Sequence, residues 1–465
     1  MNPLHVSPQD FRKVASQIAE LSERYLTEMD TRPVFPATTG QETAELFHGD
    51  APEQGLGLDA LAALQDVTRL VRVQNGRFFG YVLGSGEPIA AAADLLASVL
   101  NQNVTAWRSG PAAVTIERTV IDWLATAIGC GGSRGSLTGG GSAANLMALA
   151  MAREAKLAAN ERGLKAAADA VFYASEQVHM SIPKAVALLG IGRENLKLVP
   201  VDDLDRMIPS ALESAIQSDR AAGRVPMAVI ATAGTVNTGA IDPLGEIAVI
   251  ARRHGIWLHV DGAYGALAAI AAPEKFPGLA LADSVSLDPH KWLYQPLDCG
   301  CLLYRDATAA QKAFAHTGDY AKVLNADPIE GFAFFEESME LSRRFRALKL
   351  WLSIRYHGMA AFRESIRKNL LLAQRLASAI ASNPQLELMA PVELSAVCFR
   401  CKGQGSNEEV DRHNQAVLKR VVERGRVYLS NATIRGKFCL RACIVNHRTT
   451  EADVHAVVEE VLAAM

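Results

Sequence analysis

Short apolar runs that end at a polar residue or a glycine recur between residues 86 and 350, and helical stretches separate them. The clearest run covers residues 256–260 and leads into Asp261 and a glycine turn. A strand that is apolar on both faces is typical of a parallel sheet covered by helices on both sides. The alternation of such strands with helices therefore predicts an α/β fold built on a mostly parallel sheet.

The chain divides into three parts on this pattern. Residues 1–85 form an N-terminal arm, which begins with an amphipathic helix and continues into a polar stretch with proline and glycine. Such an arm rarely packs alone, so we expect it to lie on a partner subunit. Residues 86–350 form the large domain, and residues 351–465, with a helix, strands and a second helix, form a small α+β domain. A chain of 465 residues is long enough to bury a large core.

Lys291 follows an apolar run that ends in Asp-Pro-His, so we expect it where a buried strand turns into a loop. Lysine is rarely buried without a partner. A desolvated lysine has a lowered pKa and becomes an amine nucleophile that can form a Schiff base. The alternative is a surface lysine after a turn, which is the better interpretation for an isolated lysine.

Asp261 is expected at the carboxyl end of its strand, where ligand crevices lie in open α/β sheets. A carboxylate at that position can keep a pyridine nitrogen protonated, which makes the ring an electron sink. The alternative is an aspartate that caps the next turn.

Two further segments have the composition of a cofactor site. The glycines of residues 139–141 lead into a long helical stretch, and the N-terminus of a helix favours a phosphate. The spacing fits neither the Walker nor the dinucleotide pattern, and glycine loops also serve close packing. His179 lies between a strand that ends near Ala174 and a helix that begins near Ser181. A histidine there can stack on a cofactor or transfer protons, although a lone histidine is more often structural.

Taken together, these stretches resemble the group II pyridoxal-phosphate-dependent amino-acid decarboxylases, the family of aromatic-amino-acid, histidine and glutamate decarboxylases. Residues 284–305 fit the family's lysine signature, and further landmarks occur at residues 107–111, 342–351 and 440–446. The resemblance extends from about residue 75 to the C-terminus. It implies fold type I, with a mostly parallel seven-stranded sheet between helices and a small α+β C-terminal domain. It also implies pyridoxal 5'-phosphate (PLP) as cofactor and a homodimer with the active site at the interface.

The resemblance also implies roles for individual positions. Lys291 would hold the cofactor as a Schiff base, Asp261 would pair with the pyridinium nitrogen, and His179 would stack over the ring. Tyr320 falls in the family's mobile catalytic loop, where tyrosine delivers a proton to the substrate carbon and phenylalanine accompanies aldehyde release. The resemblance places Gly141, Ser142, Asp288 and His290 near the phosphate. It places Ala263 at the other face of the ring. Tyr81 and Gly84 would contact the substrate.

Three positions depart from the family's pattern. Asp288 stands where many relatives have asparagine or serine near the phosphate, and an acid would repel a phosphate unless it is protonated or turned away. Val236 replaces a threonine that often touches cofactor or substrate, a contact that Thr235 or Asn237 can substitute. Residues 82–83 are valine and leucine, where aromatic decarboxylases have a second aromatic residue and a proline.

The expected reaction is α-decarboxylation of an L-amino acid to the amine and carbon dioxide. We expect an aromatic or similarly bulky neutral substrate, because Phe78, Phe79 and Tyr81 supply apolar area. No cationic residue of the segment 78–84 is placed to receive a second carboxylate, and Arg77 is the nearest candidate. The alternatives are a decarboxylase of an acidic or other amino acid, an aldehyde synthase, and another fold-type I lyase or aminotransferase. A catalytically silent PLP-binding homologue is the alternative outside the enzymes.

Composition excludes several other classes of protein. With 47 basic and 50 acidic residues the chain lacks the positive footprint of a nucleic-acid-binding protein. No apolar run reaches the ~18 residues of a membrane span, and the N-terminus lacks the layout of a signal peptide. Seven cysteines suit a reducing compartment, so we expect a cytoplasmic protein. The pairs Cys398/Cys401 and Cys439/Cys443 are predicted on strands rather than in zinc knuckles, and we expect no metal.

Overall fold

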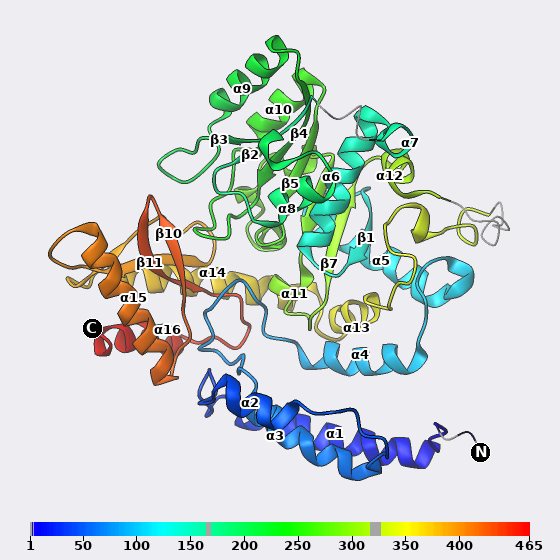
Figure 1. Cartoon of the computed structure of the whole chain (residues 1–465), viewed down its shortest axis with the longest axis vertical. Coiled ribbons are helices and arrows are strands. Elements are labelled where there is room, and N and C mark those ends of the chain that lie inside the picture. The colour runs from blue at the N-terminus through cyan, green and yellow to red at the C-terminus, as the bar shows by residue number, and fades with distance from the viewer. Residues whose placement is uncertain (1, 3, 164–168, 317–326) are drawn as a thin grey trace.

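The computed structural model describes residues 2, 4–163, 169–316 and 327–465, and it contains two β-sheets (Figure 1). The larger sheet has seven strands in the order β1-β7-β6-β5-β4-β2-β3. Strands β2 to β6 pair in parallel, whereas β7 is antiparallel to both β6 and β1. The mostly parallel α/β sheet expected from the sequence is therefore confirmed. Its strands are β1 (Arg134–Thr138), β2 (Ala170–Ser175), β3 (Leu196–Val199), β4 (Val225–Thr232), β5 (Trp257–Asp261), β6 (Ser284–Leu287) and β7 (Gly300–Tyr304).

Helices cover both faces of this sheet, as its apolar strands require. Phe172 of β2 packs into one core with α6 and α8, and the next residue, Tyr173, packs into a second core with α9 and α10. Successive side chains of a strand point to opposite faces, so each strand contributes to both cores. The helices around the sheet are α5 (Pro111–Ala127), α6 (Gly141–Leu157), α8 (Ser181–Leu188), α9 (Pro209–Ala221), α10 (Leu244–His254) and α12 (Ala307–Phe314).

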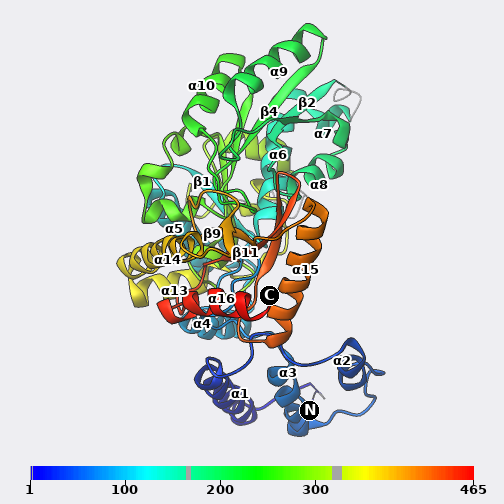
Figure 2. The ribbon, with the colours of Figure 1, turned by 90° about the vertical axis from the view of Figure 1, so that its left-hand side faces the viewer.

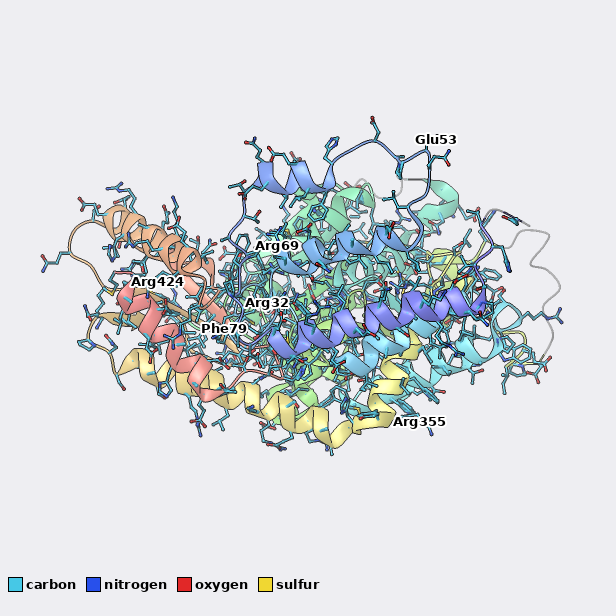
Figure 3. All side chains as sticks on the ribbon, turned by 90° about the horizontal axis from the view of Figure 1, so that it is seen from below. Arg32, Glu53, Arg69, Phe79, Arg355 and Arg424 are labelled. Atoms are coloured by element: carbon cyan, nitrogen blue, oxygen red, sulfur yellow. The ribbon has the colours of Figure 1, made fainter. Side chains whose placement is uncertain are left out.

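The smaller sheet is antiparallel and lies in the C-terminal part of the chain, in the order β10-β11-β9-β8. An N-terminal residue completes its core: Phe79 is fully buried there and bonds to the backbone of Tyr428 and Cys443 at 2.9 Å each (labelled in Figure 3). Its elements are α14 (Met359–Ala381), β8 (Leu386–Leu388), β9 (Ala396–Cys401), α15 (Asn407–Arg424), β10 (Ser430–Ile434), β11 (Lys437–Cys443) and α16 (Glu451–Ala463).

The N-terminal arm contributes α1 (Pro8–Glu28), α2 (Gly40–Phe47) and α3 (Leu64–Leu70), which lie apart from both sheets in Figures 1 and 2. Ser7 caps α1 and Pro8 occupies its first turn, so the helix begins where the sequence favours it. None of these three helices contains a buried residue. Two helices, α4 (Pro88–Leu100) and α13 (Ala347–His357), pack together between the arm and the sheet.

The division of the chain into residues 1–85, 86–350 and 351–465 stays a proposal. The two sheets and the arm helices are compatible with three parts, but they do not determine where one part ends and the next begins. Among the described residues, no helix has both the length and the apolar character that crossing a membrane requires.

Candidate active site

The expected site residues meet at one edge of the large sheet. Strands β1, β2, β5 and β6 run in the same direction, and their carboxyl ends lie at that edge. Asp261 is the last residue of β5, as the sequence predicts, and Asp288 follows β6 directly. The glycine loop follows β1, and His179 lies between β2 and α8. Four separate loops therefore supply one site.

Lys291 lies in α11 (Pro289–Trp292), a short helical turn, and not in the loop that the sequence suggested. Asp288 precedes this helix and Pro289 occupies its first position, an arrangement that favours a helix start. The turn directs the Lys291 amine to Asp288, with 2.9 Å between Nζ and Oδ2. The lysine side chain keeps 18% of its surface exposed, whereas that of Asp288 keeps 3%. The amine is therefore paired on one side and accessible on the other.

Asp288 is ionised and is paired with Lys291 and His290 of its own chain. Burial by itself would raise the pKa of this carboxyl, but Lys291 and His290 outweigh burial and hold the pKa below its usual range. The His290 Nε2 atom lies 3.4 Å from Oδ2. Oδ1 is buried and finds no hydrogen-bond partner among the described residues. The carboxylate is neither protonated nor turned away from the glycine loop, because its Oδ2 atom lies beside Gly141 and is paired with Lys291.

Asp261 is almost fully buried and accepts three hydrogen bonds. The donors are Asn145 Nδ2 at 2.9 Å, Ser286 Oγ at 3.2 Å and the backbone N–H of Ala263 at 3.2 Å. All three bonds are accepted by the carboxylate oxygens, so the group faces donors only. Such a group fits a protonated ring nitrogen, which is both a donor and a positive charge.

The start of α6 has the properties of a phosphate site. Gly140, at the N-cap position, has φ +136°, and no side chain caps the helix. A Cβ atom on Gly141 would lie 2.7 Å from the Cβ of Ala263 and 3.1 Å from Oδ2 of Asp288, so only glycine fits there. The first N–H groups of this 17-residue helix, including that of Ser142, therefore remain available to an anion.

His179 is held by the start of the next helix. Its Nδ1 atom lies 2.8 Å from Ser181 Oγ and 3.3 Å from the Ser181 backbone nitrogen. Burial lowers the pKa of His179, which favours the neutral ring. A neutral, fixed imidazole suits stacking on a flat cofactor.

The segment expected to line the substrate pocket packs against the lysine turn. The Gly84 N–H donates to the carbonyl of His290 at 3.2 Å, and a Cβ atom on Gly84 would approach that oxygen to 2.3 Å. Tyr81 has φ +57°, a strained value for a residue other than glycine, and its hydroxyl lies 3.1 Å from that of Tyr428. Arg441 Nη1 donates to the Tyr81 carbonyl at 3.0 Å and helps to hold this conformation.

Some sequence expectations find no support in the geometry, and one lies beyond it. Arg77, the nearest cation for a second carboxylate, donates instead to the Asp30 carbonyl in the arm at 2.6 Å. Thr235 bonds to Thr238, with 2.9 Å between their hydroxyls, so its polar group is already used. Tyr320 lies outside the described residues.

Sequence reasoning missed five residues that the structure brings to the site: Asn145, His259, Ser286, Tyr428 and Arg441. Two of them carried a signal in the sequence. Asn145 is one helical turn beyond Gly141, and His259 is two residues before Asp261 on the same strand face. Ser286 stands beside Asp261 only through the register of β5 and β6, which no local pattern predicts. Tyr428 is 347 residues from Tyr81, and no local pattern relates the two.

Comparisons with known proteins agree with this geometry. Residues 43–402 match the family model described as the pyridoxal-dependent decarboxylase conserved domain. An aromatic-L-amino-acid decarboxylase of Bacillus atrophaeus is 33% identical, over 99% of this chain and 96% of that protein. The crystal structure of Oryza sativa TDC with PLP and tryptamine superposes with a TM-score of 0.93 at 28% identity, over 100% of this chain and 99% of the other. The crystal structure of Rhodiola rosea 4-hydroxyphenylacetaldehyde synthase gives 0.89 at 29% identity, with coverage of 100% and 99%.

The site and the comparisons lead to the same chemistry. A reachable lysine amine, an ionised carboxylate and a glycine-rich helix start are the groups that the aldehyde, ring nitrogen and phosphate of PLP require. The expected fold type I, the PLP cofactor and the amino-acid decarboxylase activity are thereby confirmed. The chain belongs to the family of pyridoxal-dependent decarboxylases.

Proposed function

We propose that the chain converts an aromatic L-amino acid to its amine and carbon dioxide. The observation that carries this proposal is a cluster of aromatic rings in and around the segment that leads to Gly84, whose N–H bonds to the lysine turn. The ring centroid of Tyr428 lies 5.3 Å from that of Phe78 and 6.0 Å from that of Tyr81. Apolar rings in a wall of the site favour an aromatic side chain by burial and by edge or offset stacking. Relatives named for aromatic amino acids, such as the one from Bacillus atrophaeus, support the same substrate class.

Each proposed residue role follows from the contacts of that residue. When bound, PLP supplies a pyridinium ring that delocalises the electron pair left by departing carbon dioxide. Lys291 would hold the cofactor through its amine. Asp261 would keep the ring nitrogen protonated. His179 would stack over the ring, and its neutral form would avoid a second positive charge beside the pyridinium.

The phosphate and the other ring face are assigned to the glycine-rich side of the site. The N–H groups of Gly141 and Ser142 would hold the phosphate, with His290 beside it. Ala263 would lie beneath the ring, where its Cβ packs against Gly141. The Asp288 carboxylate stays paired with Lys291 and His290, so it balances the local positive charge. Tyr81 and Gly84 would border the substrate.

Tyr320 decides between the proposed reaction and a second one, aldehyde release. The structural similarity to an aldehyde synthase of Rhodiola rosea makes this alternative specific. If Tyr320 delivers the proton, Tyr320→Phe should still release carbon dioxide, but amine yield should fall and oxygen-dependent aldehyde should rise. Chromatography of both products, with Tyr304→Phe as a control outside the site, tests this. Unchanged amine formation by Tyr320→Phe would remove the residue from the mechanism.

A homodimer with the active site at its interface belongs to the same proposal. The apolar residues Phe11 and Ile18 of α1 and Leu95 and Val99 of α4 are exposed in the single chain. A second copy that covers them would place the arm as the sequence suggests. All seven cysteines are free thiols, which supports a reducing, cytoplasmic location.

The direct test is carbon dioxide release from a panel of L-amino acids. We expect the highest kcat/KM for tyrosine, tryptophan, phenylalanine or a related substrate, with one amine formed per carbon dioxide released. Lys291→Ala serves as the inactive control. Preference for glutamate or aspartate would contradict the proposal, and so would transamination without carbon dioxide.

A further inference from the structure

A chain of hydrogen bonds runs along one face of β5 beneath the site. Trp257, His259 and Asp261 occupy alternate positions of this strand, so their side chains point to the same face. Asn145 of α6 covers that face and contacts both His259 and Asp261. All four side chains are buried, so each polar atom depends on a partner within the protein.

The donors and acceptors in this chain have one consistent direction. The indole of Trp257 can only donate, and it donates to Ser284 Oγ at 2.9 Å. Asn145 Nδ2 donates to the Asp261 carboxylate, so Asn145 Oδ1 faces His259 and accepts the proton of Nε2 at 3.0 Å. Neutral His259 with its proton on Nε2 has an accepting Nδ1, to which the Ser284 hydroxyl donates at 2.9 Å. Burial lowers the pKa of His259 to about 4, so this ring stays neutral near neutral pH.

His259 and Asp261 together fix which way the Asn145 amide points. With Oδ1 turned to His259, Nδ2 donates to Asp261 Oδ2 and to Ser181 Oγ, each at 2.9 Å. The Ser181 hydroxyl can then donate to Nδ1 of His179, which leaves the proton of His179 on Nε2. A reversed amide would set an oxygen against the carboxylate and leave His259 facing a donor.

We propose that Asn145 is a positioning residue for the decarboxylation: oriented by His259, its amide holds Asp261 and, through Ser181, His179. The inference rests on the proposed roles of Asp261 and His179. One amide would then set both the carboxylate that pairs with the ring nitrogen and the imidazole that stacks on the ring. Asn145 touches neither cofactor nor substrate in this proposal and acts through the two groups that do.

The test compares the affinities of full-length variants for PLP and for its carbocyclic analogue, in which a C–H replaces the ring nitrogen. The ratio of the two dissociation constants reports the bond to the nitrogen, and a general loss of folding leaves that ratio unchanged. Asn145→Leu should reduce the preference for PLP by about tenfold and turnover by about 10–100-fold, the range usual for groups that orient a direct ligand. Asn145→Asp keeps the shape but loses both donors when ionised, so it should reduce the preference as well.

His259 supplies a rescue, and Asn414 supplies the matched control. His259→Phe should lower the preference for PLP, whereas His259→Gln keeps a donor for Asn145 and should restore most of it. Asn414 is an equally buried amide that bonds to Cys401 and Val410 in the small domain. Asn414→Leu should lower stability without changing the preference.

The outcomes separate this inference from the function on which it rests. If both dissociation constants of Asn145→Leu and Asn145→Asp rise equally, Asn145 only maintains the fold and the inference is overturned while the function stands. If Asp261→Ala leaves the preference for PLP unchanged, the role of Asp261 fails, and the inference fails with it.

Discussion

The buried residues around Asp261 and the helices of the N-terminal arm differ in how many of their side chains find partners within one chain. Asp261 accepts three hydrogen bonds from residues of the same chain, and Asn145 uses both ends of its amide. The arm helices bury no residue, and α1 leaves 45% of Phe11 and 40% of Ile18 exposed. The residues proposed for the cofactor's ring end are thus fixed within one chain, whereas the apolar side of the arm is left exposed.

This difference also separates catalysis from specificity. The groups that would act on the cofactor follow strands of the large sheet, and Asp261, Asp288 and His290 among them are buried. The aromatic cluster, in contrast, combines Tyr81, near the end of the N-terminal part, with Tyr428 from the small domain, and 51% of Tyr81 is exposed. The choice of substrate should therefore depend on how the N-terminal part and the small domain pack together. The decarboxylation step should depend mainly on residues that follow the strands of the large sheet.

The largest effect is expected from removal of the Lys291 amine, which tests whether the large domain holds the cofactor through this one group. Lys291→Ala should abolish turnover, because it removes the amine that would bind the cofactor covalently. In the unaltered protein, borohydride should fix the cofactor to Lys291, which peptide mass spectrometry can locate. A fixed label on another lysine would refute the assignment of the site.

Local sequence patterns predicted the elements that carry the site and the arm. The apolar run before Asp261 identified β5, because an uninterrupted apolar strand reflects burial on both faces. The periodicity of residues 11–25 identified α1. The Asp288-Pro289 pair also favours a helix start, which accounts for the short helical turn at Lys291, where the apolar run before it suggests a loop.

The rest could not be predicted because it joins distant segments. Asn145 and Asp261 are 116 residues apart, and their contact exists only once α6 packs across β5. The orientation of the Asn145 amide depends in turn on Ser284, on a third element. Such contacts follow from strand register and helix placement, neither of which the periodicity of a single segment determines.

The next effect tests whether the buried carboxylate is needed for its charge. Asp261→Ala should lower turnover by about 100-fold or more at full cofactor occupancy, because the ring nitrogen loses the anion that keeps it protonated. Occupancy is measured from the cofactor released by alkali, and kcat is normalised to it. Near-normal kcat at full occupancy would show that Asp261 only caps the turn after β5.

A smaller effect on chemistry is expected from the arm. Ile18→Asp should weaken the dimer, because it places a charge on the apolar stripe of α1, and sedimentation should show monomer at concentrations where the unaltered protein is dimeric. Specific activity should become dependent on protein concentration. Gln17→Asp, a charge on the neighbouring polar position, is the matched control and should leave the dimer intact. A variant Ile18→Asp that stays dimeric would indicate that α1 contacts something other than a second copy.

The smallest effect measures how much redundancy the base of the active site contains. Ser286→Ala removes one of the three donors to Asp261, a bond of 3.2 Å, while Asn145 and the Ala263 N–H still hold the carboxylate. A single hydrogen bond to a buried group contributes about 1 kcal/mol, so PLP affinity should fall by less than about tenfold and kcat by a similar factor. Equilibrium titration with PLP measures the first and steady-state kinetics the second. A loss as large as that of Asp261→Ala would mean that the three donors act as one unit. The difference between the buried site and the exposed arm helices would then be larger than three independent hydrogen bonds imply.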